Sequence, residues 1–193
     1  MNKAVFLDRD GTLNEDPGYL GDPKKLILFP DTGKSLALLK NEYNFLLIVV
    51  SNQSGVARGI ISFDDVQAVN DELNKQLQKY NVKIDAFYFC PHHPEFNNQP
   101  ECDCRKPSPK MIFEASKDFN IELSKSYFIG DTIADLEAGK NAGIQSILVK
   151  TGHGAKSLSL LQKENNFPTF VAENLFEASK FIIKDSCGVT FSD

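Results

Sequence analysis

Two carboxylates, Asp8 and Asp10, close the first apolar segment of the chain within Leu7–Thr12, which reads LDRDGT. A carboxylate can attack phosphorus and form an acyl-phosphate. A second carboxyl two positions further on can protonate the leaving oxygen and later activate water. The pair therefore indicates a nucleophile next to a general acid/base. The structural alternative is a strand that enters an Asx-type turn, in which Gly11 allows the bend.

Three further polar groups favour the catalytic interpretation when they are taken together. Ser51–Ser54 follows an apolar segment and offers hydroxyl and amide donors that suit phosphate oxygens. Asp131 follows another apolar segment, with Asp135 four positions on; taken alone, it could equally cap a helix. Lys106 precedes a helix start, where a lone basic residue is usually solvated surface. Together these groups offer a nucleophile, Mg²⁺ ligands and neutralising charge, the three needs of phosphoryl transfer.

A separate group of cysteines and histidines lies between positions 90 and 104. Cys90 and His92 form a Cys-x-His pair, and Cys102 and Cys104 form a Cys-x-Cys pair. Four such ligands suit a closed tetrahedral Zn²⁺ site, which is the structural type. His93 is the alternative histidine ligand, and free thiols in a loop are the alternative to a metal. Reduced thiols crowded beside a histidine favour a metal over disulfides.

Short apolar segments alternate with helical patterns, which predicts an α/β fold. We expect one domain over 1–193: a doubly wound, Rossmann-like parallel sheet with helices on both faces and no large cap. Ser62 with Asp65 predicts one helix start, and Ser108 before Pro109 predicts another. The expected strands are Ala4–Asp8, Phe45–Ser51, Ile84–Cys90, Tyr127–Gly130, Ser146–Lys150 and Thr169–Ala172. The other expected helices are Asp31–Tyr43, Ala134–Asn141, Ala155–Asn165 and Glu173–Lys184.

The polar groups fall at or near the ends of predicted strands, and parallel sheets bind ligands beyond the carboxyl ends of their strands. Two long connections, 9–29 and 91–107, directly follow strand ends as well, and long loops are commonly functional. Zinc is expected to fix the second connection and to direct Arg105 and Lys106 into the crevice. Loops and zinc would then take the place of a cap domain.

The composition argues against several other classes of protein. With 193 residues and a net charge of −5, the chain is expected to bind neither nucleic acid nor an anionic membrane. No apolar run approaches the ~20 residues of a membrane span, and the first residues do not read as a signal peptide. The expectation is a cytoplasmic monomer that acts on a small phosphorylated metabolite.

The chain resembles the haloacid dehalogenase superfamily of phosphatases over residues 3–151, with motifs in the family's order and spacing. The residues that carry the resemblance are Leu7–Thr12, Ser51-Asn52, Lys106 and Gly130-Asp131. The resemblance implies that Asp8 is the nucleophile and Asp10 the general acid/base. It implies Mg²⁺ bound by the side chains of Asp8 and Asp131 and by the backbone carbonyl of Asp10. Ser51 and Lys106 would hold the transferring phosphoryl group.

The zinc loop narrows the resemblance to the heptose-bisphosphate and histidinol-phosphate phosphatases, which form one subgroup. Asp135 also fits the fourth motif, as a supporting acid. Thr132 departs from the lysine that many members carry, which puts a substrate contact at that position in doubt. The substrate contacts that the subgroup implies are Asp16, Pro17, Gly18, Tyr19, Ser51, Asn52, Gln53, Ser54, Arg105 and Lys106.

The implied activity is hydrolysis of the C7 phosphate of D-glycero-D-manno-heptose 1,7-bisphosphate, in nucleotide-heptose synthesis for surface lipopolysaccharide. Histidinol-phosphate hydrolysis is the nearest alternative. A phosphoacceptor signalling domain is a non-enzyme alternative, but Asp10 argues against it, because a built-in base would not preserve a stored aspartyl-phosphate. A zinc-stabilised binding module would leave the aspartate set without a role.

Overall fold

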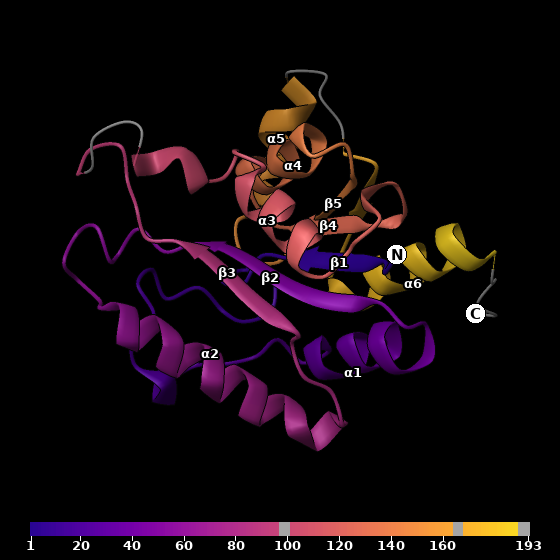
Figure 1. The fold of residues 1–193 in the computed structure, drawn as a ribbon, viewed down its shortest axis with the longest axis horizontal. Helices are drawn as coiled ribbons and strands as arrows, with labels where there is room; N and C mark the ends of the chain where they lie inside the picture. Colours follow the sequence, from indigo (N-terminus) through magenta and orange to yellow (C-terminus); the bar gives the residue numbers. More distant parts are fainter. Residues whose placement is uncertain (97–100, 164–167, 189–193) are drawn as a thin grey trace.

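The computed structural model describes residues 1–96, 101–163 and 168–188, without the side chains of Glu101 and Cys102. Six parallel strands form one sheet in the order β3-β2-β1-β4-β5-β6 (Figure 1). Every strand that the sequence predicts is present, with ends that differ by at most two residues. The strands are β1 (Ala4–Leu7), β2 (Leu46–Asn52), β3 (Ala86–Cys90), β4 (Tyr127–Gly130), β5 (Gln145–Val149) and β6 (Phe170–Ala172).

Helices cover both faces of this sheet, as predicted, with α1 and α2 on one side and α3, α4 and α5 on the other (Figure 1). The α-helices are α1 (Thr32–Ala37), α2 (Phe63–Leu77), α3 (Lys110–Asp118), α4 (Ile133–Asn141), α5 (Gly154–Lys163) and α6 (Leu175–Cys187). The short helices are η1 (Pro23–Lys25), η2 (Leu38–Glu42), η3 (Gln78–Tyr80), η4 (Glu101–Cys104) and η5 (Leu123–Lys125). The expected end of α5 at Asn165 lies outside the described residues.

The two faces follow from the alternation of side chains along each buried strand. In β1, Val5 and Leu7 belong to the hydrophobic cluster beneath α1, α2 and α6. Ala4 and Phe6 point the other way, into the cluster that α3 and α4 cover. Because β1 is the central strand and is apolar on both faces, its carboxyl end is fixed from both sides.

Two helix starts, those of α2 and α3, were predicted from capping residues in the sequence. At α2 the predicted capping box is present: the Ser62 hydroxyl accepts from the Asp65 N–H, and the Asp65 carboxylate accepts from the Ser62 N–H. At α3 the helix begins at Lys110 with Pro109 as its N-cap, one residue later than predicted, but the Ser108 hydroxyl still accepts from the Lys110 N–H at 3.3 Å. The Ser108 N–H donates to the Arg105 carbonyl, which closes a turn just before the helix.

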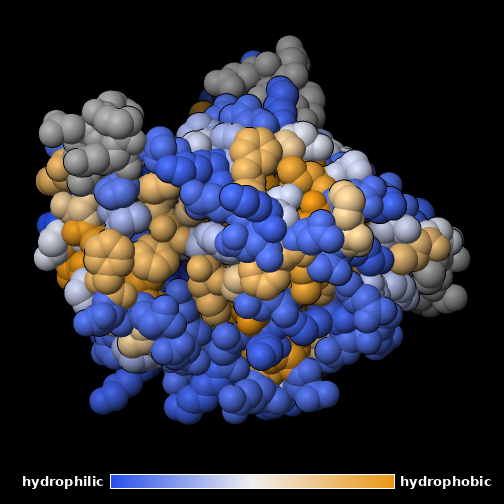
Figure 2. All heavy atoms as spheres, viewed as in Figure 1, coloured by the Kyte–Doolittle hydropathy of each residue, from blue (hydrophilic) through white to orange (hydrophobic). Residues whose placement is uncertain are grey.

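The strand order places the predicted catalytic edge at the centre of the sheet. β1 lies between β2 and β4, and connections leave toward opposite sides of the sheet at this point. Ligands of doubly wound sheets bind at such a switch point, beyond the carboxyl ends of the strands. On the face shown in Figure 2, hydrophobic residues are interleaved with hydrophilic ones. Among the described residues, no helix has the length and apolar character needed to span a membrane.

Candidate active site

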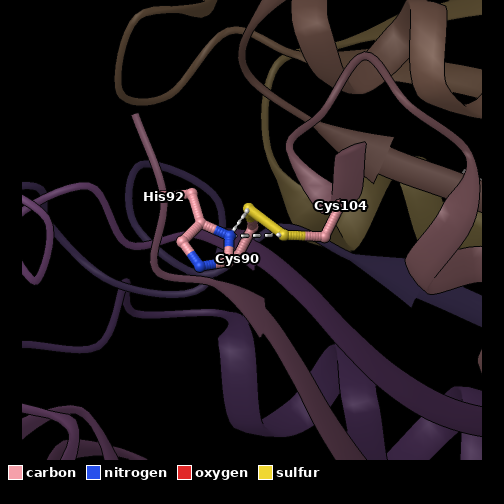
Figure 3. A group of neighbouring side chains, drawn as sticks. All are labelled: Cys90, His92 and Cys104. Atoms are coloured by element: carbon pink, nitrogen blue, oxygen red, sulfur yellow. Dashed lines mark hydrogen bonds between the residues drawn. A yellow bond between two sulfur atoms is a disulfide. The ribbon is translucent and has the colours of Figure 1, made fainter. Parts of the chain in front are cut away.

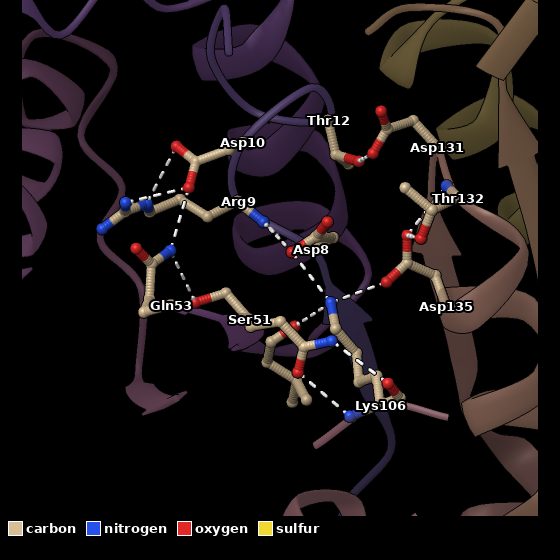
Figure 4. A network of polar contacts seen from close by, with 12 residues as sticks. Asp8, Arg9, Asp10, Thr12, Ser51, Gln53, Lys106, Asp131, Thr132 and Asp135 are labelled. Atoms are coloured by element: carbon tan, nitrogen blue, oxygen red, sulfur yellow. Dashed lines mark hydrogen bonds and ion pairs between the residues drawn. The ribbon is translucent and has the colours of Figure 1, made fainter. Parts of the chain in front are cut away.

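Lys106 lies at the centre of a buried polar network that joins the ends of β1, β2 and α4 (Figure 4). Its Nζ is 2.9 Å from Asp8 Oδ1 and 2.6 Å from Asp135 Oδ1, and it donates to the Val50 carbonyl at 2.7 Å. These contacts use the three donors of the ammonium group. Asn52 fixes the backbone of Lys106, because its Oδ1 accepts from the Lys106 N–H and its Nδ2 donates to the Lys106 carbonyl.

Three buried carboxylates converge beside this lysine. Asp8, Asp131 and Asp135 each offer an oxygen, and these oxygens lie within 4.8 Å of one another. Burial and the charge of Asp135 raise the pKa of Asp8 well above its ordinary value, against the opposing effect of Lys106. The same two causes, burial first, raise the pKa of Asp131 to about 6. The lysine pKa is also raised: burial acts to lower it, but the charges of Asp135 and Asp8 outweigh that effect.

The donor set of this cluster fits a hard divalent cation. When all three carboxylates are ionised, their three negative charges face the single positive charge of Lys106, which leaves two negative charges to be balanced. Carboxylate oxygens are the ligands that Mg²⁺ uses in proteins, and a bound cation reverses the effect of crowding on the pKa values. The cluster contains two of the three predicted magnesium ligands, Asp8 and Asp131.

The third predicted ligand, Asp10, was expected to bind through its backbone carbonyl, and its side chain points away from the acid cluster (Figure 4). Its two carboxylate oxygens accept from Arg9 Nε at 3.2 Å and Arg9 NH2 at 2.9 Å. Asn14 and Gln53 each donate an amide N–H to the same carboxylate at 2.9 Å. Burial acts to raise the pKa of Asp10, but the Arg9 guanidinium and these hydrogen bonds outweigh it and hold the pKa below its ordinary value.

Asp131 is held between two glycines that belong to different parts of the chain. A side chain at either Gly11 or Gly152 would collide with its carboxylate. The carboxylate accepts from the Thr12 hydroxyl at 3.3 Å and from the His153 backbone N–H at 2.7 Å. Gly152 has a φ of +54°, which a residue with a side chain adopts only with strain. The segment after β5 therefore helps to fix Asp131.

A cavity of about 280 Å³ opens above Asp8 and Asp10. Asp16 stands on its rim, where its carboxylate accepts from the Gly18 N–H at 2.7 Å and lies 3.3 Å from His153 Nε2. Two predicted substrate contacts do not line the cavity: Pro17, and Ser51, which is buried and whose hydroxyl accepts from Gln53 Nε2. The predicted residues that do line it are Asp16, Gly18, Tyr19, Asn52, Gln53, Ser54, Arg105 and Lys106.

Comparisons with known proteins agree with this geometry. The profile of the HAD-hydrolase-like family matches residues 103–178. A D-glycero-D-manno-heptose-1,7-bisphosphate 7-phosphatase of Chlorobaculum tepidum is 40% identical over 186 residues, which cover 91% of this chain and 92% of that protein. The chain belongs to the haloacid dehalogenase-like phosphatases.

Two other members of the family are similar to this chain in sequence or in structure. A D-glycero-beta-D-manno-heptose-1,7-bisphosphate 7-phosphatase of Haemophilus ducreyi is 44% identical over 154 residues, covering 78% of this chain and 84% of that protein. The crystal structure of a D,D-heptose 1,7-bisphosphate phosphatase from B. bronchiseptica, complexed with magnesium and phosphate, has a TM-score of 0.84 and 30% identity. It covers 95% of this chain and 99% of that chain. The expected fold, enzyme class and family are thus confirmed.

In this HAD-like phosphatase the predicted zinc ligands come together in part (Figure 3). The ligand atoms of Cys90, His92 and Cys104 lie within 4.8 Å of one another. Cys90 and Cys104 are joined as a disulfide, and His92 Nδ1 lies 3.9 and 3.4 Å from their sulfur atoms. The side chain of Cys102 lies outside the described residues. The alternative ligand, His93, instead contacts Arg58 at 3.4 Å.

The HAD-like site also contains residues that the sequence did not predict. His153 was not among the predicted site residues, yet it lines the cavity and its backbone N–H donates to Asp131. The sequence did contain an indication of this role, because the segment with His153 directly follows β5 and so lies at the same edge of the sheet as Asp8, Ser51 and Asp131. Thr151 donates its hydroxyl to the Gly11 carbonyl at 2.7 Å and ties this segment to the loop after β1, which contains Asp8 and Asp10.

Proposed function

We propose that this HAD-like phosphatase hydrolyses the C7 phosphate of D-glycero-D-manno-heptose 1,7-bisphosphate through an aspartyl-phosphate on Asp8. Relatives named as D-glycero-D-manno-heptose-1,7-bisphosphate 7-phosphatase and as its alpha-specific counterpart match over 91% and 93% of this chain. The observation that carries the mechanism is the setting of Asp8. Its Oδ1 accepts from the Arg9 N–H at 2.8 Å and lies 2.9 Å from Lys106 Nζ. Among the described residues no donor reaches Oδ2, so this oxygen is the one left to attack phosphorus.

Two steps then follow from the residues on each side of the phosphoryl group. Asp8 Oδ2 bonds to phosphorus while the ester bond to the sugar oxygen breaks and Asp10 gives that oxygen a proton. Asp10, now a carboxylate, takes a proton from water, whose oxygen attacks phosphorus and releases Asp8 and inorganic phosphate. Lys106 stabilises the charge that develops on the transferring group. Magnesium held by Asp8 and Asp131 would supply further neutralising charge.

The lowered pKa of Asp10 in the free protein suits the second step directly, because a base must be unprotonated. For the first step the same group must carry a proton. A phosphate dianion close to a carboxylate raises the pKa of that carboxylate. Substrate binding therefore favours the protonated form of Asp10 at the point where an acid is needed.

A bisphosphate has a second phosphate that must bind away from the reacting centre, and Arg105 is our candidate for holding it. Arg105 lines the cavity next to Lys106, and its NH1 donates to the His92 carbonyl at 3.3 Å. A guanidinium can form two parallel hydrogen bonds to phosphate oxygens. The His92 contact links the orientation of Arg105 to the cysteine loop.

We further propose that the reduced loop binds a structural zinc ion through Cys90, His92, Cys102 and Cys104. The convergence of three of these ligands supports it. Zinc–sulfur bonds of about 2.3 Å put tetrahedral ligands roughly 4 Å apart, which fits the 3.9 and 3.4 Å from His92 Nδ1 to the two sulfur atoms, whereas the sulfurs of Cys90 and Cys104 must separate on reduction. Zinc requires all three cysteines as thiolates, so the bond between Cys90 and Cys104 must be reduced, and we expect the metal-loaded form in the cytoplasm, where thiols stay reduced. Size-exclusion chromatography tests the expected monomer.

The deciding experiment is a substrate panel with Mg²⁺: both anomers of the heptose bisphosphate, other sugar phosphates and histidinol phosphate. We expect the highest kcat/KM with a heptose bisphosphate. Faster turnover of histidinol phosphate would assign the enzyme to histidine synthesis instead. Asp8→Asn should remove nearly all turnover, because a neutral amide cannot attack phosphorus, and more than a few percent residual activity would refute the covalent mechanism.

A further inference from the structure

Arg9 lies between the two catalytic aspartates in sequence, yet its side chain does not line the cavity. It is fully buried, with an exposed fraction of 0%. The guanidinium forks onto Asp10 through Nε and NH2, so both oxygens of the carboxylate are held in one plane. A buried cation of this kind needs a partner for each of its donor groups. Its remaining terminal nitrogen, NH1, therefore decides how the fork is anchored.

That anchor is Asn70, in the middle of α2. Arg9 NH1 donates to Asn70 Oδ1 at 3.0 Å, and Asn70 is 2% exposed. Asn70 lies on the buried side of α2 beside Val69 and Leu73, where an apolar residue would be expected. An amide buried among aliphatic side chains is costly unless it is hydrogen-bonded. The bond to Arg9 accounts for this amide in the core.

We propose that Asn70 is a positioning residue of the phosphatase reaction, which acts on Asp10 through Arg9. This inference rests on the acid/base role proposed above for Asp10. Helix α2 holds Asn70 in place, and the bond from Arg9 NH1 to Asn70 sets the orientation of the guanidinium. The guanidinium in turn sets the plane of the Asp10 carboxylate. Gln53 and Asn14 also donate to this carboxylate, at Oδ2 and Oδ1, so loss of the Asn70 contact should tilt the carboxylate rather than release it. Proton transfer to a leaving oxygen depends steeply on such geometry.

The leaving group distinguishes positioning from a purely structural role. An alkoxide leaves only as a proton from Asp10 reaches it, whereas p-nitrophenolate leaves readily without a proton. A displaced Asp10 therefore slows an alkyl phosphate more than p-nitrophenyl phosphate. A loss of folded protein, or of phosphate binding, reduces kcat/KM for both substrates by the same factor.

The test compares Asn70→Leu with Asn74→Leu, one turn further along the same helix. Asn74 Oδ1 accepts from the Ile84 N–H at 2.8 Å, so its replacement also removes a buried-side hydrogen bond, but one without a link to the site. We expect Asn70→Leu to lower kcat/KM for glycerol 1-phosphate about tenfold, a part of the ~10²–10⁴ of a general acid. For p-nitrophenyl phosphate the loss should stay within about threefold. Asn74→Leu should change kcat/KM for the two substrates by the same factor.

Two further variants make the result decisive. Asn70→Asp keeps an acceptor oxygen opposite NH1 and should restore the alkyl phosphate rate, and Asn70→Ala replaces Asn70→Leu if the latter does not fold. Equal losses on both substrates, or no loss, in the variants without an acceptor overturn the inference. Asp10→Asn is the reference. If it discriminates between the substrates and Asn70→Leu does not, this inference alone fails; if Asp10→Asn does not discriminate, the acid role fails as well.

Discussion

Removing divalent cations should make the stability of this protein fall as the pH rises through about 6. The cause is the crowding of Asp8, Asp131 and Asp135 around one lysine. A carboxyl whose pKa is raised by folding binds its proton more tightly in the folded state. Its protonation therefore stabilises the fold at low pH, and this contribution is lost as the pH rises from the unfolded pKa through the folded pKa.

The size of the effect can be worked out for Asp131, which is fully buried. Its pKa is about 6 in the folded state against an ordinary value of 3.8. This difference corresponds to roughly 3 kcal/mol in the free energy of unfolding. Asp8 acts in the same direction. For a chain of this size, roughly 3 kcal/mol shifts the melting temperature by about 6–12 °C. The lowered pKa of Asp10 acts in the opposite direction, but only below its ordinary value, outside this window.

The assay is thermal unfolding followed by circular dichroism at about pH 4.5 and about pH 7.5, with EDTA or with Mg²⁺, because most of the loss falls between the two pKa values of 3.8 and about 6. With EDTA the melting temperature should be lower at the higher pH. Magnesium binds only the folded, ionised cluster, so it should raise the melting temperature most at the higher pH. Asp131→Asn should flatten the EDTA curve. A metal-free melting temperature that rises or stays constant across this window would refute the reasoning, as would equal stabilisation by Mg²⁺ at both values.

Three further outcomes are expected. Arg105→Ala should lower kcat/KM for the bisphosphate by one to two decades, about the ~1.5–3 kcal/mol of a charge-assisted hydrogen bond, with a much smaller change for p-nitrophenyl phosphate; equal losses would contradict the distal-phosphate role. Gly152→Ala should abolish the Mg²⁺-dependent rise in melting temperature, because the new Cβ would collide with the carboxylate of Asp131, a proposed Mg²⁺ ligand. The control is Gly143→Ala, which also lies at positive φ but in open space and should keep that rise. Cys104→Ser should lower the zinc content measured in protein purified under reducing conditions, whereas the exposed Cys187 is the matched control; unchanged zinc in Cys104→Ser would contradict the zinc proposal.

The gathering of the candidate site residues at one edge of the sheet could be predicted because it depends on a rule of topology. Asp8, Ser51 and Asp131 each come at or just beyond the carboxyl end of a buried strand, and parallel strands bring such ends to one edge. Apolar segments mark the strands directly in the sequence. The capping pair of Ser62 and Asp65 could be predicted for a similar reason, since both partners lie within one turn.

Side-chain directions could not be predicted, because they depend on contacts between distant segments. The pattern LDRDGT gives no indication that Arg9 points inward, toward a residue 61 positions away on α2. His153 follows the strand-end rule, but its approach to Asp16 depends on how two loops meet. The start of α3 lies one residue later than predicted, where a turn from Arg105 to Ser108 precedes the helix. The sequence analysis favoured a metal over disulfides in the cysteine loop, whereas the structure joins Cys90 and Cys104 as a disulfide.

The placement of Asp131 between Gly11 and Gly152 affects how the protein is made. The loop after β1 leaves the ribosome first, but the hydroxyl that ties it in place belongs to Thr151, 140 positions later. β1 also waits for β4 before its second edge is paired. A nascent chain therefore carries all the residues of the early motifs without a working centre. Catalytic competence should arise abruptly, once the segment after β5 has been synthesised and has docked.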